Sequence, residues 1–456
     1  MSKIRSVAVL ILSWNGRKHL ETCLPALVAQ RDPGVAWRVM VLDNGSWDGT
    51  GEWVAQHHPA VELIRSDVNL GFCRGVNRLV ARCDADAVAL LNDDTRPRED
   101  WLAALVDALR AAPPDVAAAS GKIVDWRGER LDFGRGLMTF DGHAFQLDYR
   151  RPLERARVPA AGAELPFACG GNMLIRRRSF QAAGGFDGDY FAYLEDVDLG
   201  WRLWAGGERV IFAPAAVVHH RSMASSDLLG YAHRGFLFER NAFLTAYKNY
   251  QPGLFENVMP AILWTLLHRT QTLLVQNNPG GDELTLDPYA GHIANTAAPE
   301  DAAAEPASAI DAAGRALAPA PAPPSIGLYG KWRAYGTREL LRRGLRKAVR
   351  AALPRFVLDP APAAGVPLLT DGRTVAQLRA ITYLLGHLDA AADKRHAVQA
   401  RRRRPDGEIF ARFPAAVVPT YPGDERLFAS AAFAELLPAG LPVVRYRLDE
   451  VMELDS

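Results

Sequence analysis

The feature that most constrains the fold is a short apolar run that ends in carboxylates. Residues 87–91, Ala-Val-Ala-Leu-Leu, are followed at once by Asn92, Asp93 and Asp94. An uninterrupted apolar run of this length is typical of a parallel strand buried on both faces. In α/β proteins the carboxyl ends of such strands form the edge where ligands bind. The run therefore predicts a parallel sheet that delivers two carboxylates to a ligand site.

The first quarter of the chain alternates strand and helix patterns. The strand-like runs are residues 7–13, 37–42, 61–64 and 87–91, and helical patterns cover residues 19–30, 48–56, 71–82 and 101–109. This alternation predicts an α/β fold, Rossmann-like, with a mostly parallel sheet flanked by helices. Further along, residues 172–175, 210–212 and 217–218 are strand-like, whereas 179–183 and 196–204 are helical; Pro214 separates the last two strand-like runs.

Composition divides the remaining chain. Residues 294–325 are dominated by Ala and Pro, a composition that buries too little apolar surface to hold a fold and indicates a disordered linker. We therefore expect a catalytic domain at residues 1–250, a helical extension at 251–293, this linker, and a mainly helical C-terminal region at 326–456.

Charge and cysteine usage exclude several classes of protein. The chain has 53 basic and 52 acidic residues, a formal net charge of +1, which offers no support for nucleic-acid binding. The four cysteines form no Cys-x-x-Cys pair, which argues against a structural zinc site and favours a reducing, cytoplasmic setting. Two basic clusters, at residues 342–350 and 401–404, are either solvated helix faces or contacts to anionic lipid or glycan carriers.

The apolar stretches are too short or too interrupted to cross a bilayer. The run at residues 7–12 is followed by no small-residue cleavage site, and His268, Arg269 and Gln271 interrupt the stretch at 258–275. We expect no spanning helix and no signal peptide. The sequence leaves open a peripheral contact at the inner face of the plasma membrane and the formation of homo-oligomers.

Four polar clusters follow strand-like runs. They are residues 13–16 (Ser-Trp-Asn-Gly), 43–46 (Asp-Asn-Gly-Ser), 69–71 (Asn-Leu-Gly) and 92–94 (Asn-Asp-Asp). Because parallel strands end at one edge, the four should converge on a nucleotide pocket. Asp43 is either an acceptor for a base or ribose or a simple turn residue. The carboxylates at 93 and 94 suit Mg²⁺ or Mn²⁺ holding a diphosphate.

Two later segments carry further titratable groups. Glu195, Asp196 and Asp198 lie at a predicted helix start, where acids are stabilised by the helix dipole; the alternative is a general base that deprotonates a hydroxyl. His219 and His220 follow an apolar strand and are either structural or able to complete a metal shell as neutral imidazoles.

Taken together, these segments resemble the family 2 glycosyltransferases, which are inverting enzymes with the GT-A fold. Within that family the chain is most similar to the rhamnosyltransferase-like and galactofuranosyltransferase-like enzymes of bacterial surface glycans. The resemblance spans roughly residues 5 to 250, and its motifs are residues 9–16, 41–50, 69–77, 91–95, 170–175, 195–202 and 218–220.

The resemblance implies roles for individual residues. The donor nucleotide and sugar would be bound by Ser13, Trp14, Asn15, Asp43, Asn69, Asp93, Gly171 and Asn172. The acceptor site would be shaped by Glu195, Asp198 and Trp201. Asp94 and His219 would bind the metal, although His220 is adjacent, and Asp196 would be the catalytic base.

The implied reaction is a metal-dependent single displacement. A UDP-, dTDP- or GDP-linked sugar would be transferred, with inversion, to a hydroxyl of a glycan or lipid-linked glycan. Two other hypotheses remain: a sugar nucleotidyltransferase, which should carry a Gly-rich triphosphate loop after the first strand, and a non-catalytic glycan-binding subunit. The segment Ser13–Lys18 supplies only a weak version of that loop.

Overall fold

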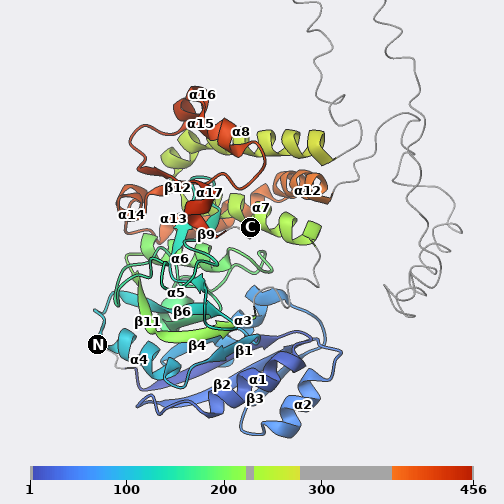
Figure 1. Cartoon of the computed structure of the whole chain (residues 1–456), viewed down its shortest axis with the longest axis vertical. Coiled ribbons are helices and arrows are strands. Elements are labelled where there is room, and N and C mark those ends of the chain that lie inside the picture. Colours follow the sequence, from blue (N-terminus) through green and yellow to red (C-terminus); the bar gives the residue numbers. More distant parts are fainter. Residues whose placement is uncertain (1–3, 222–230, 278–371, 454–456) are drawn as a thin grey trace, which may run out of the picture. The chain divides into compact units, whose positions relative to one another are not determined.

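A mixed sheet of nine strands organises the first 220 residues (Figure 1). The computed structural model describes residues 4–221, 231–277 and 372–453, so the predicted linker at 294–325 and the basic cluster at 342–350 lie outside the described residues. The strands are β1 (Ser6–Ser13), β2 (Ala36–Asn44), β3 (Glu62–Ser66), β4 (Ala87–Leu91), β5 (Thr95–Pro97), β6 (Val116–Asp125), β7 (Leu131–Phe133), β10 (Asn172–Arg176) and β11 (Arg209–His220).

Strand order explains why one edge of the sheet collects polar side chains. The order is β3-β2-β1-β4-β10-β6-β11-β5, with β7 beside β6. The first four strands are parallel, as predicted, and so are β6 and β11, whereas β10 runs antiparallel between β4 and β6. β1 and β4 are almost wholly buried, which is why they appear in the sequence as continuous apolar runs.

Pro214 does not divide β11 into two strands, in contrast to the predicted break. The strand continues past it because the register with β6 shifts between Ala213 and Val217. A bulge of this kind lets one strand accommodate a residue that cannot donate to the ladder. The shift also changes which of the following side chains point to each face of the sheet.

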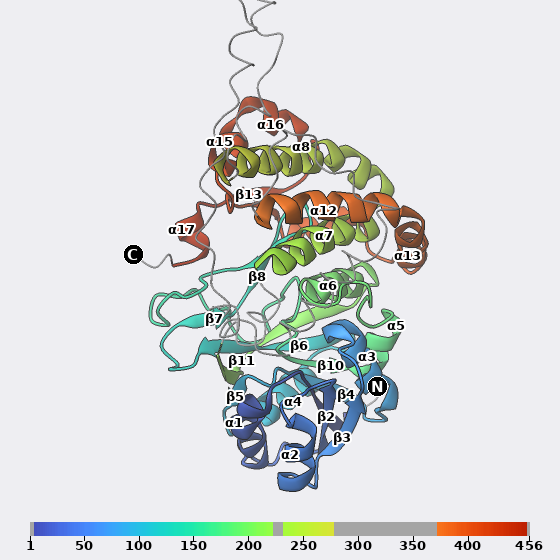
Figure 2. The same ribbon diagram turned by 90° about the vertical axis from the view of Figure 1, so that its right-hand side faces the viewer.

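Helices cover both faces of the sheet. They are α1 (Arg17–Val28), α2 (Thr50–His57), α3 (Gly71–Arg82), α4 (Trp101–Ala111), α5 (Arg177–Ala182) and α6 (Glu195–Ala205). Figures 1 and 2 show α4 on one side of β6 and β11 and α6 on the other. This arrangement confirms the predicted α/β architecture.

The later segments are mainly helical, as expected, and pack as layers beyond α6 (Figure 2). Their helices are α7 (Tyr231–Asn249), α8 (Pro252–Asn277), α12 (Gly372–Gly386), α13 (Leu388–Ala400), α14 (Asp406–Arg412), α15 (Asp424–Ala429), α16 (Ala431–Leu436) and α17 (Leu448–Val451). Two small ribbons, β8 (Gly136–Met138) with β9 (Ala144–Gln146) and β12 (Ala415–Val417) with β13 (Val443–Arg445), join them. Among the described helices none combines the length and the hydropathy needed to span a bilayer.

The C-terminal segments share one apolar core with the sheet domain. Phe410 packs against Trp201 of α6 with ring centroids 5.0 Å apart, and Phe433 packs against Phe140 at 5.6 Å. Residues 370–456 accordingly form one unit with residues 1–277. The arginine cluster at 401–404 takes part in this packing, since Arg404 donates to the carbonyl of Trp204 at 2.8 Å.

The last described residues also contact the first part of the chain. Tyr149 and Met452 form a parallel bridge, in which the Glu453 amide donates to the Tyr149 carbonyl at 2.8 Å. The tail is thereby fixed beside the hairpin of β8 and β9, far from it in sequence.

Candidate functional site

The four polar turns predicted after the strands meet at one edge of the sheet. Ser13 Oγ donates to Asp93 Oδ2 at 2.6 Å, although the two residues are 80 positions apart. Asn44 Nδ2 donates to Asn69 Oδ1 at 2.9 Å. Asn15 belongs to the same set, because its side-chain oxygen accepts the Trp47 amide at 2.9 Å. The parallel arrangement of the strands produces this convergence, since their carboxyl ends lie at the same edge of the sheet.

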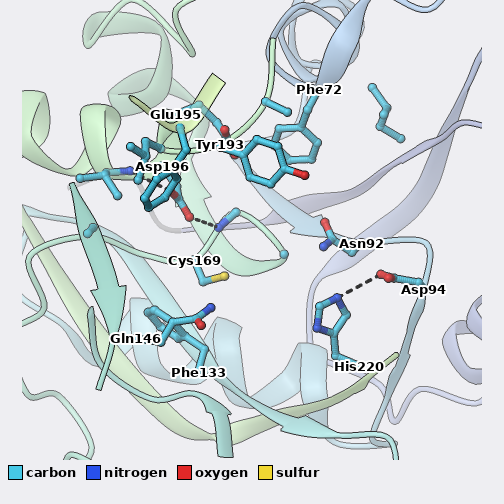
Figure 3. A pocket seen from close by; sticks show the side chains of 18 of the residues that line it. Phe72, Asn92, Asp94, Phe133, Gln146, Cys169, Tyr193, Glu195, Asp196 and His220 are labelled. Atoms are coloured by element: carbon cyan, nitrogen blue, oxygen red, sulfur yellow. Dashed lines mark hydrogen bonds and ion pairs between the residues drawn. The ribbon is translucent and has the colours of Figure 1, made fainter. Parts of the chain in front are cut away.

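A cavity of about 630 Å³ opens beside these turns. Figure 3 shows Asp94 and His220 on one side of the cavity and Glu195 and Asp196 on another. Its wall also includes predicted donor residues: Trp14, Asn69, Asp93 and Gly171. The indole Nε1 of Trp14 is buried without a hydrogen-bond partner, so it can donate to a ligand there.

A carboxylate–imidazole pair forms the first corner of the cavity. His220 Nε2 lies 3.3 Å from Asp94 Oδ1, and its Nδ1 lies 2.6 Å from Asp132 Oδ2. Burial raises the pKa of Asp94, but the hydrogen bond and charge of His220 outweigh burial, and the net shift is downward. Asp94 is therefore held as a carboxylate with one imidazole nitrogen beside it.

This corner has the chemistry of a divalent-cation site. Asp132 fixes the orientation of His220 from behind, as a second carboxylate commonly does for a metal-binding histidine. Within residues 4–221, 231–277 and 372–453, no three His, Cys, Asp or Glu side chains are clustered as a complete metal cage. Asp94 and His220 are the two groups of this corner that could bind a divalent cation.

His220 lies beside Asp94, whereas His219, the predicted metal ligand, does not. Successive side chains of a strand point to opposite faces, so only one of the two histidines can reach the cavity. The ring of His219 instead lies against the turn at Gly128, where a Cβ would come within 2.9 Å of it. His219 is not among the residues that line the cavity.

Asp93 lies deeper than Asp94 and interacts mainly with protein groups. Burial raises its pKa, and the neighbouring Asp94 adds to the effect. Its carboxylate lies so close to Gly16 that a Cβ there would approach Asp93 Oδ2 to 2.1 Å. Glycine at position 16 therefore permits the start of α1 to lie against the carboxylate.

Asp196 occupies the first turn of α6. Its Oδ2 accepts the Gly170 amide at 3.0 Å and its Oδ1 accepts its neighbour Val197's amide at 2.8 Å. Burial raises the pKa of Asp196, while these backbone donors partly offset the rise. A carboxylate with a raised pKa in an accessible cavity is a better proton acceptor than an ordinary aspartate.

Glu195 lines the same wall and has an unsatisfied oxygen. Its Oε2 is buried without a hydrogen-bond partner. Burial, followed by the nearby Asp196 charge, raises the pKa of Glu195. An unpaired buried carboxyl oxygen is costly unless a ligand satisfies it, so this atom can bind a hydroxyl that enters the cavity.

The turn that leads into α6 has an unusual backbone. Phe191, Tyr193 and Leu194 have φ angles of 64°, 73° and 62°, a left-handed region that costs a non-glycine residue roughly 1–2 kcal/mol. The ring of Phe191 lies so near Gly71 that a Cβ there would approach it to 2.5 Å. Such a turn persists only where its surroundings hold it.

Asp198 and Trp201, which were predicted to shape the acceptor site, do not line the cavity. Asp198 is fully buried and pairs with Arg202 at 2.6 Å and with Lys248 at 3.0 Å. Trp201 packs against Tyr250 with ring centroids 5.0 Å apart. Both lie on the faces of α6 that turn away from the cavity.

Four of the predicted donor residues support the cavity from behind. Asn172 is buried and donates to the carbonyls of Lys122 and Ala216 at 3.1 and 3.2 Å. Asp43 Oδ1 accepts the Ser46 amide at 3.1 Å. These two, together with Ser13 and Asn15, are not among the lining residues.

An aromatic wall of the cavity was not predicted from the sequence. It is formed by Phe133, Phe145, Tyr149, Phe167 and Phe238, and Met452 from the tail adds an apolar, non-aromatic side chain to it. These residues come from β7, β9, connecting loops, α7 and the segment after α17. Each segment contributes one or two side chains, which give no local sequence signal of a binding site. The wall exists only once the segments pack together.

The part of the chain that contains the polar turns after the strands matches known proteins in sequence. The sequence model described as "Glycosyl transferase family 2" matches residues 8–184. The chain is 32% identical over 234 residues to the N-acetylglucosaminyl-diphospho-decaprenol L-rhamnosyltransferase of Mycobacterium tuberculosis, covering 47% of this chain and 76% of that protein. It is 28% identical over 185 residues to the pre-mycofactocin glycosyltransferase of the same species, covering 40% and 37% of the two chains.

Two solved structures are similar at low sequence identity. One is GalNAc-T7 with UDP, GalNAc and Mn²⁺, with a TM-score of 0.44, 14% identity and coverage of 57% of this chain and 52% of that one. The other is the mannosyltransferase PcManGT of Pyrobaculum calidifontis with GDP-Man and Mn²⁺, with a TM-score of 0.40, 19% identity and coverage of 64% and 80%.

Proposed function

Because this chain belongs to glycosyltransferase family 2, as its rhamnosyltransferase relative shows, we propose that it transfers a sugar from a nucleoside-diphosphate donor to a glycan hydroxyl with inversion. The observation that carries the proposal is the single cavity that contains the Asp94–His220 pair, Asp196 and an aromatic wall. A donor and an acceptor need to meet in one such space.

The donor would occupy the side formed by the strand ends. Trp14 offers an unpaired indole donor, and Asn69 lies beside it on the wall. Asp94 and His220 would hold a divalent cation, which neutralises charge on a departing diphosphate when bound. Beneath this side of the cavity, Asp93 contacts Ser13 and Gly16.

Asp196 is the proposed general base. Its carboxylate would take the proton of the acceptor hydroxyl as that oxygen attacks the anomeric carbon from the face opposite the leaving group. Its raised pKa keeps the proton-accepting power of the carboxylate high. The unpaired Oε2 of Glu195 would orient the same acceptor.

The acceptor would approach along the aromatic wall. Aromatic faces suit the apolar faces of sugar rings and buried apolar chains. The mycobacterial relative is named for a decaprenol-linked acceptor, which supports a lipid-linked glycan here. Such an acceptor is anchored in a bilayer, so we place the reaction at a membrane surface.

A donor panel tests this function. UDP-, dTDP- and GDP-sugars should raise the melting temperature only when Mn²⁺ or Mg²⁺ is present, and one of them should be transferred with inverted anomeric configuration. Asp94→Ala should abolish the metal-dependent rise, whereas Asp107→Ala, an exposed acid on α4, should keep it.

The same assay separates the alternatives. Pyrophosphate release from a nucleoside triphosphate would identify a nucleotidyltransferase. Glycan binding with neither transfer nor donor hydrolysis would identify a non-catalytic subunit. Either result, or a metal-dependent rise that Asp94→Ala leaves intact, contradicts the proposal.

A further inference from the structure

The geometry points to Arg240 and Asn241 of α7 as positioning residues, which hold the turn before α6 and thereby place Asp196. The inference rests on the proposed function, because Asp196 is the proposed base. Both residues lie beyond residue 184, where the family match ends. Neither lines the cavity, so any effect on transfer must act through the turn.

Asn241 binds the backbone of the turn directly. It is fully buried. Its side-chain nitrogen Nδ2 donates to three carbonyls, those of Tyr190 (3.1 Å), Ala192 (2.9 Å) and Tyr193 (2.8 Å). An amide nitrogen has only two hydrogens, so three converging acceptors use its full donor capacity. These carbonyls flank the residues with left-handed backbone angles.

Arg240 sets the orientation of that amide. Its Nε and Nη2 donate to Asn241 Oδ1 at 2.9 and 2.8 Å, which fixes the oxygen on one side and leaves the nitrogen facing the turn. Its Nη2 also donates to the carbonyls of Asp189 and Tyr190 at 2.7 and 2.9 Å. Arg240 and Asn241 thus bind the carbonyls of four residues of the turn between them: Asp189, Tyr190, Ala192 and Tyr193.

The same helix holds α6 on the other side of Asp196. Asn249 Nδ2 donates to Asp198 Oδ1 at 2.9 Å, and Lys248 Nζ lies 3.0 Å from the same oxygen. The middle and the C-terminal end of α7 therefore hold the chain before and after the proposed base. Burial would raise the pKa of Asp198, but the charges of Arg202 and then Lys248 outweigh burial and lower it.

The turn needs such support because its backbone angles are unfavourable without it. Phe191, Tyr193 and Leu194 adopt left-handed φ values, and residues in that region keep them only when neighbouring groups enforce them. Without the amide the turn can relax, and Asp196 would move relative to the Gly170 amide that it accepts at 3.0 Å. A displacement of about 1 Å at a reacting group can lower a rate by about 100-fold.

Asn241→Ala is the main test. We expect kcat to fall by about 30- to 100-fold, while the donor KM stays within about threefold, because the strand-end turns make no contact through Asn241. Amide hydrogen exchange should become faster at residues 190–198 and stay unchanged in β1 and β4. The exchange readout does not depend on activity.

Two further variants keep the test decisive. Arg240→Lys retains the charge but removes the guanidinium group, whose Nε and Nη2 make these hydrogen bonds. It should lower kcat by about three- to tenfold and speed amide exchange at residues 190–198. Tyr250→Phe is the matched control, since it removes a buried hydrogen bond to Thr139 (3.1 Å) just after α7. It should lower the melting temperature without changing kcat or exchange at the turn.

The possible results separate the two proposals. Wild-type kcat and exchange in Asn241→Ala, or losses no greater than in Tyr250→Phe, would overturn the positioning role. If Asn241→Ala does not fold, unchanged kcat and exchange in Arg240→Lys overturn it instead. A wild-type protein that transfers no sugar refutes the proposed function, whereas the exchange pattern still decides whether Arg240 and Asn241 hold the turn.

Discussion

The two sides of the cavity are built in different ways. The donor side consists mainly of turns that follow β1, β2, β3 and β4 within the first 95 positions and that bind one another, as Ser13 and Asp93 do; His220 at the end of β11 joins them. The opposite side combines α6, α7, β7, β9 and the tail around Met452. Local patterning specifies the first side, whereas long-range packing specifies the second.

This difference suggests a division of labour. The donor side follows from strand geometry, which changes little when loops vary. The side around Asp196 depends on a strained turn and on side chains from α7. We therefore expect substitutions on the donor side to alter metal and nucleotide binding, and substitutions on the other side to alter kcat or the acceptor KM.

The largest effect is expected for the proposed base. Asp196→Asn removes the proton acceptor but keeps a group of the same shape, so kcat should fall by about 1,000-fold. Donor binding, measured by calorimetry with Mn²⁺, should remain within about twofold. Transfer at a near wild-type rate would show that Asp196 is not the base.

The histidine pair gives a matched comparison on the donor side. His220→Ala removes the imidazole beside Asp94 and should weaken metal-dependent nucleotide binding by about 10- to 100-fold. His219→Ala changes the adjacent residue, whose ring lies at Gly128 instead, and should change binding less than threefold. Equal losses in titrations of the two variants would argue against the assignment.

A smaller effect is expected on the aromatic wall. Met452→Ala shortens a side chain that lines the cavity and should raise the acceptor KM by about tenfold, since missing methylenes in an apolar pocket cost about that factor. The donor KM should not change. A shift in donor KM alone would place the acceptor elsewhere.

The smallest effect on transfer, but a clear one on stability, is expected at His143. This buried histidine lies 3.1 Å from Asp141 and 3.5 Å from Glu239, and its ring packs against Phe238 of the cavity wall. Burial alone would lower its pKa, but the two carboxylates outweigh burial and raise it to about 9.

A raised folded-state pKa fixes the sign of the pH dependence. The stabilisation from protonated His143 is complete below pH 6.5, the ordinary pKa, and is lost as pH rises to about 9. Its upper size is about 3 kcal/mol. The melting temperature should therefore fall more steeply between pH 6.5 and pH 9.5 in the wild type than in His143→Gln. Equal slopes of melting temperature against pH in the two proteins would contradict this expectation.

Much of the sheet domain was predictable because its signals are local. The bounds of α3 and β4 agree with the periodicity of residues 71–82 and 87–91, and the four polar turns converge as parallel topology requires. Asp94 and Asp196 were both found from such patterns, and both line the cavity.

The failures have physical causes of their own. β6 was missed because Ala117, Ala118 and Ala119 carry little hydrophobic signal, although they are fully buried. His219 was preferred to His220 because one position decides the face of a strand, and the bulge after Ala213 alters that alternation. Arg240 and Asn241 gave no signal, since their partners are backbone carbonyls 48 to 51 positions away.

The bridge between Tyr149 and Met452 bears on how such an enzyme can be redesigned. A chimera that exchanges only residues 8–184 would replace the donor turns together with Phe133, Phe145, Tyr149 and Phe167, and would leave Phe238 and Met452 of the recipient on the same wall. Recombination breakpoints placed between α7 and the tail would separate side chains that touch one another. Changing the acceptor preference therefore calls for transplanting residues 131–167, α7 and the tail together.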